Sequence, residues 1–174
     1  AKDPTIGNRM INARAEKLSS SKAFAKAFET RRCIIPASGF YEWQKVDAGP
    51  GRRAQRKPFY VHTKDGEPLA LAGLWEVWYD AEDKPLPTCT IITTEPNALL
   101  APIHDRMPVV LPERDWDRWL VPEPLTEKQQ AAMLGPAPGG LLVLNEVGTQ
   151  VNSPDNDGPE LVEPAKREGH PSTT

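Results

Sequence analysis

Three short polar segments carry side chains that could do acid–base or phosphate-binding chemistry. The first is N-A-R-A-E at residues 12–16. It spaces an amide, a guanidinium and a carboxylate by two residues, so on a strand Asn12, Arg14 and Glu16 would share one face. Arginine offers a forked donor for phosphate, and asparagine both donates and accepts hydrogen bonds. The same row is also typical of the solvated face of an antiparallel sheet, and the residues alone leave both interpretations open.

The second segment, G-F-Y-E-W at residues 39–43, places Glu42 among aromatic neighbours. Aromatic packing would take water away from the carboxyl and raise its pKa, as in a general acid or base that works near neutral pH. The alternative is a glutamate at a strand edge with its carboxylate in water, since glutamate is seldom fully buried.

The third segment, I-H-D-R-M-P at residues 103–108, contains His104 and Arg106. A histidine side chain exchanges protons near neutral pH, and the arginine could bind a phosphate or hold Asp105. A structural histidine bonded to the backbone is the alternative. The sequence shows no Ser-His-Asp nucleophile elbow, phosphate-binding loop or dinucleotide fingerprint. Together the segments indicate an acid–base site with phosphate-binding arginines.

Composition limits the class of protein. The 174 residues suit one domain, and no apolar run approaches the roughly 20 residues of a membrane span, so we expect no membrane partner. We interpret Cys33 and Cys89 as buried, reduced thiols of a cytosolic protein. Without CxxC spacing, and with three histidines, they predict no metal site. Residues 1–60 hold 13 basic against 5 acidic residues, which could form a basic face or scatter over the surface.

The elements that must position these residues are short. The 19 prolines favour short strands with many turns. Strands are expected at residues 10–16, 33–43, 58–63, 69–79, 88–94, 109–111 and 141–144. Helices are expected at residues 19–32, 112–120 and 126–134, the last with a capping box of Thr126 and Gln129, and a basic, mobile loop at residues 47–57. Asp65-Gly66 predicts a hairpin between residues 58–63 and 69–79. We therefore expect an α+β fold with a curved, mostly antiparallel, barrel-like sheet and a few short peripheral helices.

Five segments, in order along the chain, resemble the successive motifs of the SRAP (SOS-response-associated peptidase) family. They are I-N-A-R-A-E (11–16), R-C-I-I-P-A-S-G-F-Y-E-W (32–43), A-G-L-W-E (72–76), I-I-T-T-E-P-N (91–97) and I-H-D-R-M-P-V-V-L (103–111). The resemblance implies an SRAP domain over residues 1–153, followed by a polar, disordered tail at residues 154–174.

The resemblance also implies a function, which is to sense and shield abasic sites in single-stranded DNA through a covalent thiazolidine crosslink. The family's nucleophile is the cysteine after the initiator Met, which is removed autocatalytically. In that mechanism Glu42 would assist both reactions and His104 would move the proton of the ring-opened sugar. The side chains that would contact DNA or the lesion are Asn12, Arg14, Thr93 and Arg106. No cofactor is implied, and we expect a monomer in the cytoplasm, at the nucleoid when bound to DNA.

One departure from the family pattern matters. Family members begin Met-Cys-Gly-Arg, whereas this chain begins Ala1-Lys2-Asp3-Pro4. We therefore expect the family's N-terminal segment to be missing from this chain and the chain alone to form no thiazolidine. The alternatives are a non-covalent single-stranded DNA-binding module and a small peptidase.

Overall fold

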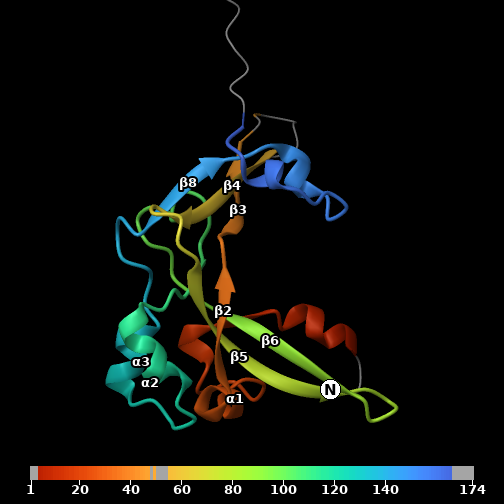
Figure 1. Ribbon diagram of the computed structural model, residues 1–174, viewed down its shortest axis with the longest axis vertical. Helices are drawn as coiled ribbons and strands as arrows, with labels where there is room; N and C mark the ends of the chain where they lie inside the picture. Colours follow the sequence, from red (N-terminus) through yellow and green to blue (C-terminus); the bar gives the residue numbers. More distant parts are fainter. Residues whose placement is uncertain (1–3, 48, 50–54, 166–174) are drawn as a thin grey trace, which may run out of the picture.

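The strands lie in two open sheets (Figure 1). The computed structural model describes residues 4–47, 49 and 55–165. The first sheet has the order β1–β6–β5–β2, with β7 beside β6. Its strands are β1 (Asn12–Arg14), β2 (Arg32–Ala37), β5 (Leu69–Tyr79), β6 (Pro85–Thr94) and β7 (Met107–Pro108). The second sheet has the order β3–β4–β8 and consists of β3 (Phe40–Val46), β4 (Gln55–Thr63) and β8 (Leu142–Glu146). The β1–β6 pair is parallel, and the other pairs between these strands are antiparallel.

The helices are short and peripheral. The α-helices are α1 (Ala25–Thr30), α2 (Trp116–Leu120) and α3 (Glu127–Met133). The 3-10 helices are η1 (Pro4–Arg9), η2 (Ala15–Lys17), η3 (Glu113–Asp115), η4 (Thr149–Asn152) and η5 (Pro159–Val162). The expected α+β fold is confirmed, but its barrel-like character is not, because the strands divide between two sheets that do not close.

The division begins between β2 and β3, where a single strand was expected at residues 33–43. Only Ser38 and Gly39 separate them, yet they belong to different sheets. A Cβ at Gly39 would lie 2.5 Å from the Tyr60 ring and 2.5 Å from the carbonyl oxygen of Val61. Glycine is therefore required where the chain leaves the first sheet and passes close to β4.

The expected hairpin of β4 and β5 is wrong. A turn does form, since the Thr63 hydroxyl donates to the Glu67 carbonyl oxygen at 2.6 Å and Gly66 has a positive φ of 82°. However, β4 pairs with β3 and β8, whereas β5 pairs with β2 and β6. The local turn signal was correct, but the strand partners are set by segments far away in the sequence.

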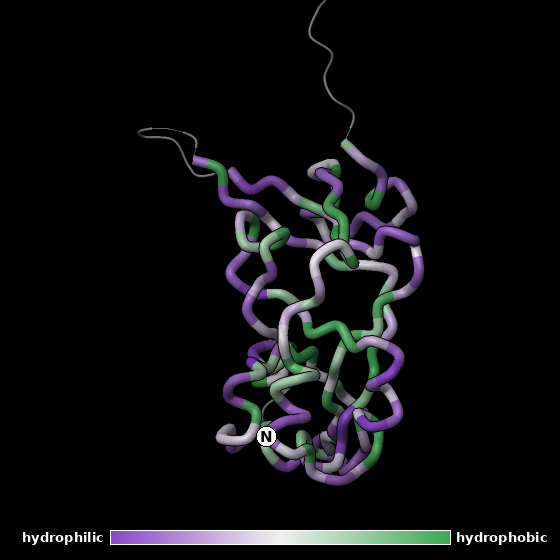
Figure 2. The backbone as a smooth tube through the Cα atoms, turned by 90° about the vertical axis from the view of Figure 1, so that its left-hand side faces the viewer, coloured by the Kyte–Doolittle hydropathy of each residue, from purple (hydrophilic) through white to green (hydrophobic). Residues whose placement is uncertain are grey.

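Two clusters of buried side chains form the core. One surrounds Trp119, which is 0% exposed, and includes Phe28 and Ile92. The other contains Val61, Leu100 and Met107 and lies where the two sheets approach each other. In agreement, the longest hydrophobic stretches run through the middle of the molecule (Figure 2). The core thus supports β6 and the segment that ends at Met107.

Buried Arg32, at the start of β2, joins α1 to α2. It is 5% exposed, and its guanidinium donates to five backbone carbonyls. Those carbonyls belong to Phe28, Glu29, Trp119, Val121 and Glu123. Burial lowers the pKa of Arg32, because the charged form loses water. A buried cation therefore connects the carboxyl ends of two short helices.

The helix expected at residues 19–32 is shorter in the structure. The Ser21 hydroxyl accepts from the Ala23 N–H at 3.3 Å, and α-helix begins only at Ala25. Such local bonds compete with a helix start. The capping box of α3 is confirmed, because the Thr126 hydroxyl accepts from the Gln129 N–H and the Gln129 side chain accepts from the Thr126 N–H.

Two segments of interest lie partly outside the described residues. Of the basic loop at residues 47–57, the structure describes Asp47, Gly49 and residues 55–57, where β4 begins. Of the tail at residues 154–174, it describes residues 154–165. There η5 forms, and the Ala165 N–H donates to the Glu146 carbonyl oxygen at 2.7 Å.

Candidate functional site

Two exposed side chains project from β1. Ala13 is 1% exposed and its neighbours Asn12 and Arg14 face solvent, as the strand alternation predicts. The parallel register places Arg14 beside Thr93 of β6. Neither Asn12 nor Arg14 forms a side-chain hydrogen bond with another residue of the described part of the chain. Both side chains are therefore available to a ligand.

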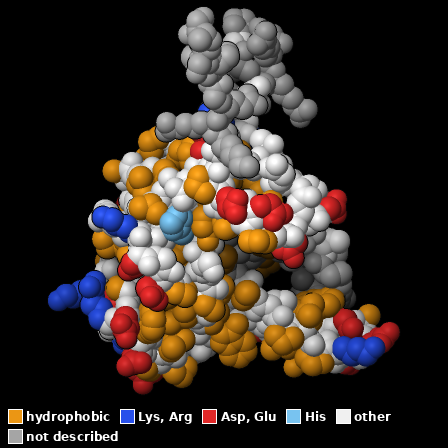
Figure 3. All heavy atoms as spheres, turned by 45° about the horizontal axis from the view of Figure 1, so that its top comes forward, with side chains coloured by type: hydrophobic (Ala, Val, Ile, Leu, Met, Phe, Trp, Pro, Cys, Tyr) orange, Lys and Arg blue, Asp and Glu red, His pale blue; other side chains and the backbone are white. Residues whose placement is uncertain are grey.

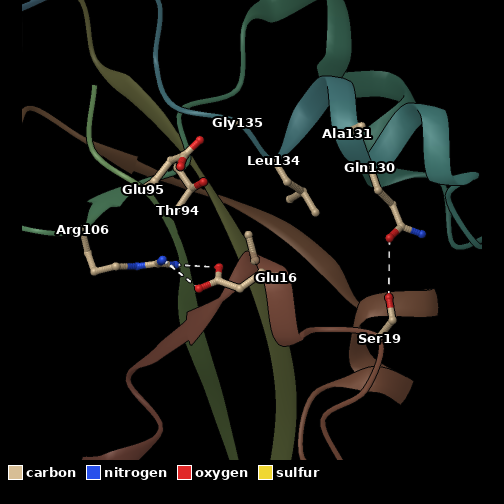
Figure 4. A pocket seen from close by; sticks show the side chains of 10 residues that line it. Glu16, Ser19, Thr94, Glu95, Arg106, Gln130, Ala131, Leu134 and Gly135 are labelled. Carbon is tan, nitrogen blue, oxygen red and sulfur yellow. Dashed lines mark hydrogen bonds and ion pairs between the residues drawn. The ribbon is translucent and has the colours of Figure 1, made fainter. Parts of the chain in front are cut away.

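Next to β1, Arg106 forms the most extensive polar cluster of this surface (Figure 4). Its Nη1 and Nη2 donate to the two carboxylate oxygens of Glu16 at 2.8 and 3.0 Å. Nη2 also donates to the Thr93 carbonyl oxygen at 2.5 Å and lies 3.4 Å from the Thr93 hydroxyl. The Arg106 guanidinium lowers the pKa of Glu16. Thr93 and Arg106, predicted from different motifs, are thus in direct contact.

Glu42 is a desolvated carboxyl on β3. It shares the face of Phe40, which packs on the core, and its side chain is 17% exposed. Burial raises the pKa of Glu42, and nearby Asp105 raises it further, whereas His104 and a hydrogen bond from the Trp43 backbone oppose the rise. The predicted direction is confirmed. The cause is different, because Tyr41 and Trp43 point to the opposite face of the strand.

His104 faces Glu42. Its Nδ1 lies 3.7 Å from Glu42 Oε2 and 3.5 Å from Asp105 Oδ1. The Arg106 N–H lies 3.1 Å from the same nitrogen. Nδ1 therefore has both a donor and carboxylate acceptors around it, and Nε2 has no partner within the described part of the chain. A ring in this setting can exchange a proton with a bound molecule.

The segment before His104 is fixed at two points. The buried Leu100 carbonyl oxygen accepts from the His104 N–H at 2.9 Å. The Gln44 side chain, two residues along β3 from Glu42, donates to the Pro102 carbonyl oxygen at 3.2 Å. Gln44 therefore ties the histidine segment to the strand that carries the carboxyl.

The structure brings together five of the six predicted residues through three pairs of neighbours and one short segment of chain. Glu42 meets His104, Arg14 lies beside Thr93, and Thr93 meets Arg106. His104 and Arg106 are two residues apart. Asn12 pairs with Ile91, two residues before the Arg14–Thr93 pair on each strand. Glu16 was expected on the same strand face as Asn12 and Arg14, but β1 ends at Arg14 and Glu16 lies on η2, so that expectation was wrong. Gln44 was not predicted from the sequence.

A hollow of about 590 Å³ adjoins the Arg106 cluster (Figure 4). Its walls include Glu16, Thr94, Glu95, Gln130 and Leu134. On the face shown in Figure 3, basic, acidic and hydrophobic side chains of the described residues are interspersed. That face therefore shows no continuous basic surface from the basic first third of the chain.

The two cysteines are free, but their surroundings differ from the expectation. Cys33 is half-buried, and burial raises its thiol pKa to about 11. Cys89 is exposed, so the expectation that it is buried was wrong. Within the described residues, no cluster of His, Cys, Asp and Glu is suited to bind a metal ion. No helix of the described ranges is long and apolar enough to cross a membrane.

The chain is similar to several proteins that are each described as an abasic site processing protein. It is 44% identical to the abasic site processing protein YoqW of Bacillus subtilis over 163 residues, which cover 94% of this chain and 70% of that protein. It is 30% identical to the abasic site processing protein YedK of Escherichia coli, covering 89% and 67%. It is 27% identical to the abasic site processing protein HMCES of Gallus gallus, covering 88% and 49%.

Solved structures and a family model agree with these matches. A protein from Bacteroides thetaiotaomicron superposes with a TM-score of 0.81 at 26% identity, over 95% of this chain and 72% of that chain. A phage-related protein from Bordetella bronchiseptica gives a TM-score of 0.60 at 29% identity, over 79% and 63%. The family model described as SOS response associated peptidase (SRAP) matches residues 1–154. The chain therefore belongs to the SRAP family.

Proposed function

We propose that the protein senses abasic sites in single-stranded DNA and shields them through a covalent DNA–protein crosslink. The observation that carries this proposal is the desolvated Glu42 carboxyl, 3.7 Å from His104 Nδ1, within a chain whose relatives are named abasic site processing proteins. A carboxyl with a raised pKa beside a histidine with a free Nε2 is suited to the proton transfers that such a crosslink requires.

The chemistry consists of three steps. The sugar at an abasic site opens to an aldehyde: the bond between the ring oxygen and C1′ breaks, His104 would give the ring oxygen a proton, and the C1′ hydroxyl loses its proton as it becomes the carbonyl. A free amine then adds to the aldehyde carbon, and loss of one water leaves an imine. A neighbouring thiol adds to the same carbon, its proton passes to the nitrogen, and a thiazolidine ring closes. Glu42 would accept and return protons in these steps, and no cofactor is needed.

The amine and thiol must belong to one residue, because the ring contains both. The family resemblance assigns them to the cysteine that follows the initiator Met, with Glu42 assisting removal of that Met. Cys33 and Cys89 cannot supply them, since their α-nitrogens lie in peptide bonds within β2 and β6. We therefore propose that this chain alone forms no thiazolidine. Hydrolysis would be limited to removal of the initiator Met in a protein that carries the family's N-terminal cysteine.

DNA contacts would come from the exposed row on β1 and its neighbours on β6. Arg14 would bind a backbone phosphate and Asn12 would line the site. Thr93 would bond to the extruded sugar, and Arg106 beside it would contact the DNA backbone near the lesion. An abasic position has no base to unstack, so moving its sugar into a site costs little. We expect a monomer in the cytoplasm, at the nucleoid when bound to DNA.

A denaturing gel tests the covalent mechanism. The chain as printed and the protein expressed from its own start codon are each incubated with single-stranded DNA that carries one abasic site, with intact DNA of equal length as the control. We expect a shifted band when the protein expressed from its own start codon is incubated with abasic DNA. Glu42→Gln in that protein should weaken the shifted band. The chain as printed should give no shifted band. A start-codon protein that gives no shifted band, yet prefers abasic DNA in a native gel, would point to non-covalent binding instead.

A further inference from the structure

Glu16 takes no part in the chemistry above, yet it makes the two shortest side-chain contacts of Arg106 with another side chain. We propose that Glu16 is a positioning residue. Its two hydrogen bonds with Arg106 hold the segment of residues 104–106 so that His104 faces Glu42. Its effect on lesion recognition rests on the proposed function. Its effect on His104 does not.

The Glu16–Arg106 pair joins two elements that are distant in the sequence. Glu16 lies on η2, directly after β1, and Arg106 lies directly before β7. Both oxygens of the carboxylate accept from Arg106, an arrangement that fixes orientation as well as distance. The Arg106 side chain is 18% exposed and the Glu16 side chain 51%, whereas both side chains of the surface pair Lys84–Glu82 are 72% exposed. The Arg106 pair is therefore less weakened by water than an ordinary surface pair.

The backbone of Arg106 links the Glu16–Arg106 pair to His104. Its N–H lies 3.1 Å from His104 Nδ1, the nitrogen that faces Glu42. The Arg106 carbonyl oxygen lies 3.2 Å from the same nitrogen, so Nδ1 has a backbone donor and a backbone acceptor beside it. Positioning by Glu16 requires that Nδ1 accepts from the N–H, which places the proton of the neutral ring on Nε2, a nitrogen with no partner within the described residues. A fixed Arg106 thus keeps the donor nitrogen of His104 directed away from the protein, toward a ligand.

A different role for Glu16 makes the opposite prediction. If Glu16 merely competed with DNA phosphate for Arg106, its removal would strengthen binding to abasic DNA. Removal of any acidic side chain from a DNA-binding surface also strengthens binding to DNA in general, because repulsion of phosphate decreases. The informative quantity is therefore the ratio of affinities for abasic and intact DNA, in which the general effect of charge cancels.

Glu95 provides a matched control. Its carboxylate lines the same hollow as Glu16 and Arg106, it is exposed, and it forms no ion pair with another described residue. Glu95→Gln therefore removes the same charge from the same region and leaves the hydrogen bonds between Glu16 and Arg106 intact.

Fluorescence anisotropy then compares the printed chain, Glu16→Gln and Glu95→Gln on single-stranded oligonucleotides with and without one abasic analogue. We expect Glu16→Gln to lower the abasic-to-intact affinity ratio by roughly tenfold, as for loss of a charge-assisted hydrogen bond, and Glu95→Gln to leave it unchanged. A ratio that rises or stays constant in Glu16→Gln overturns the positioning role.

Nitrogen NMR of histidine-labelled protein without DNA tests the same inference independently. The His104 signals are assigned by their loss in His104→Gln. At mildly alkaline pH, we expect an unprotonated Nδ1 in the unmutated chain and in Glu95→Gln, and a mixture of the two neutral tautomers in Glu16→Gln. An unchanged tautomer in Glu16→Gln refutes the inference. If the unmutated chain shows no abasic preference, the affinity ratio carries no information, the denaturing gel decides the proposed function, and the NMR result alone decides the role of Glu16.

Discussion

Arg32→Lys should destabilise the chain strongly although it conserves the charge. The Arg32 guanidinium reaches five carbonyls at the ends of α1 and α2, at distances that include 2.7 Å to Phe28 and 2.7 Å to Trp119. A lysine ammonium has three donors on one atom, so at least two of those carbonyls would lose their partner. Loss of two charge-assisted hydrogen bonds, at about 1.5–3 kcal/mol each, predicts a destabilisation of about 3–6 kcal/mol.

Urea denaturation and thermal unfolding measure this effect. For a chain of this length, about 3–6 kcal/mol corresponds to a decrease in Tm of about 6–24 °C. Arg114→Lys is the matched control, because its side chain is 80% exposed and its contact with Asp115 is 3.8 Å long. That change should stay within about 0.5 kcal/mol. If Arg32→Lys lowered Tm by no more than Arg114→Lys does, the five carbonyl contacts would not stabilise the fold as argued.

Three further predictions concern the strand crossing, the carboxyl and the DNA contact. Gly39→Ala should cost about 1–3 kcal/mol in urea denaturation, because its Cβ would meet the Tyr60 ring at 2.5 Å, whereas Gly139→Ala, with open space around it, should be nearly neutral. The raised pKa of Glu42 means that the unfolded chain loses this proton first as pH rises. The free energy of unfolding should therefore fall from about pH 4.5 upward until the pH passes the raised pKa, and a Glu42→Gln chain that kept the same fall would contradict this. Arg14→Ala should weaken binding to abasic and intact single-stranded DNA alike and reduce the slope of log affinity against log salt by about 0.7, and an effect on abasic DNA alone would argue against a phosphate contact.

The types of most elements could be predicted from the sequence because they depend on local chemistry. The Thr126–Gln129 capping box and the burial of Ala13 between exposed neighbours follow from spacing alone. The choice of strand partners could not be predicted in this way. Residues 58–63 and 69–79 flank a true turn, but β4 pairs with β8, about 80 residues further along the chain, and so joins the second sheet.

The candidate site shows the same division between local and distant information. Residue type identified Glu42 and His104 as acid–base candidates, but their approach to 3.7 Å depends on where β3 and the segment before β7 lie. The desolvation of Glu42 was expected from its aromatic neighbours in the sequence. In the structure Tyr41 packs on Tyr60 at 5.4 Å on the other face of the strand, so the burial comes from the core side.

The two arginines of the predicted DNA contact also separate in the structure, and this division bears on how the lesion would be recognised. Arg14 is exposed, and its side chain forms no hydrogen bond or close ion pair with another described residue, although its charge acts on Glu16 from a distance, so its donors are open to a phosphate. The two Nη groups of Arg106 are engaged by Glu16 and Thr93, its Nε has no partner among the described residues, and its backbone touches His104. A free arginine adds affinity for any strand, because every nucleotide carries a phosphate. An engaged arginine instead fixes the geometry around the reacting sugar, which only a lesion presents. Discrimination would then depend on the contacts within the protein, and affinity on the exposed row of β1.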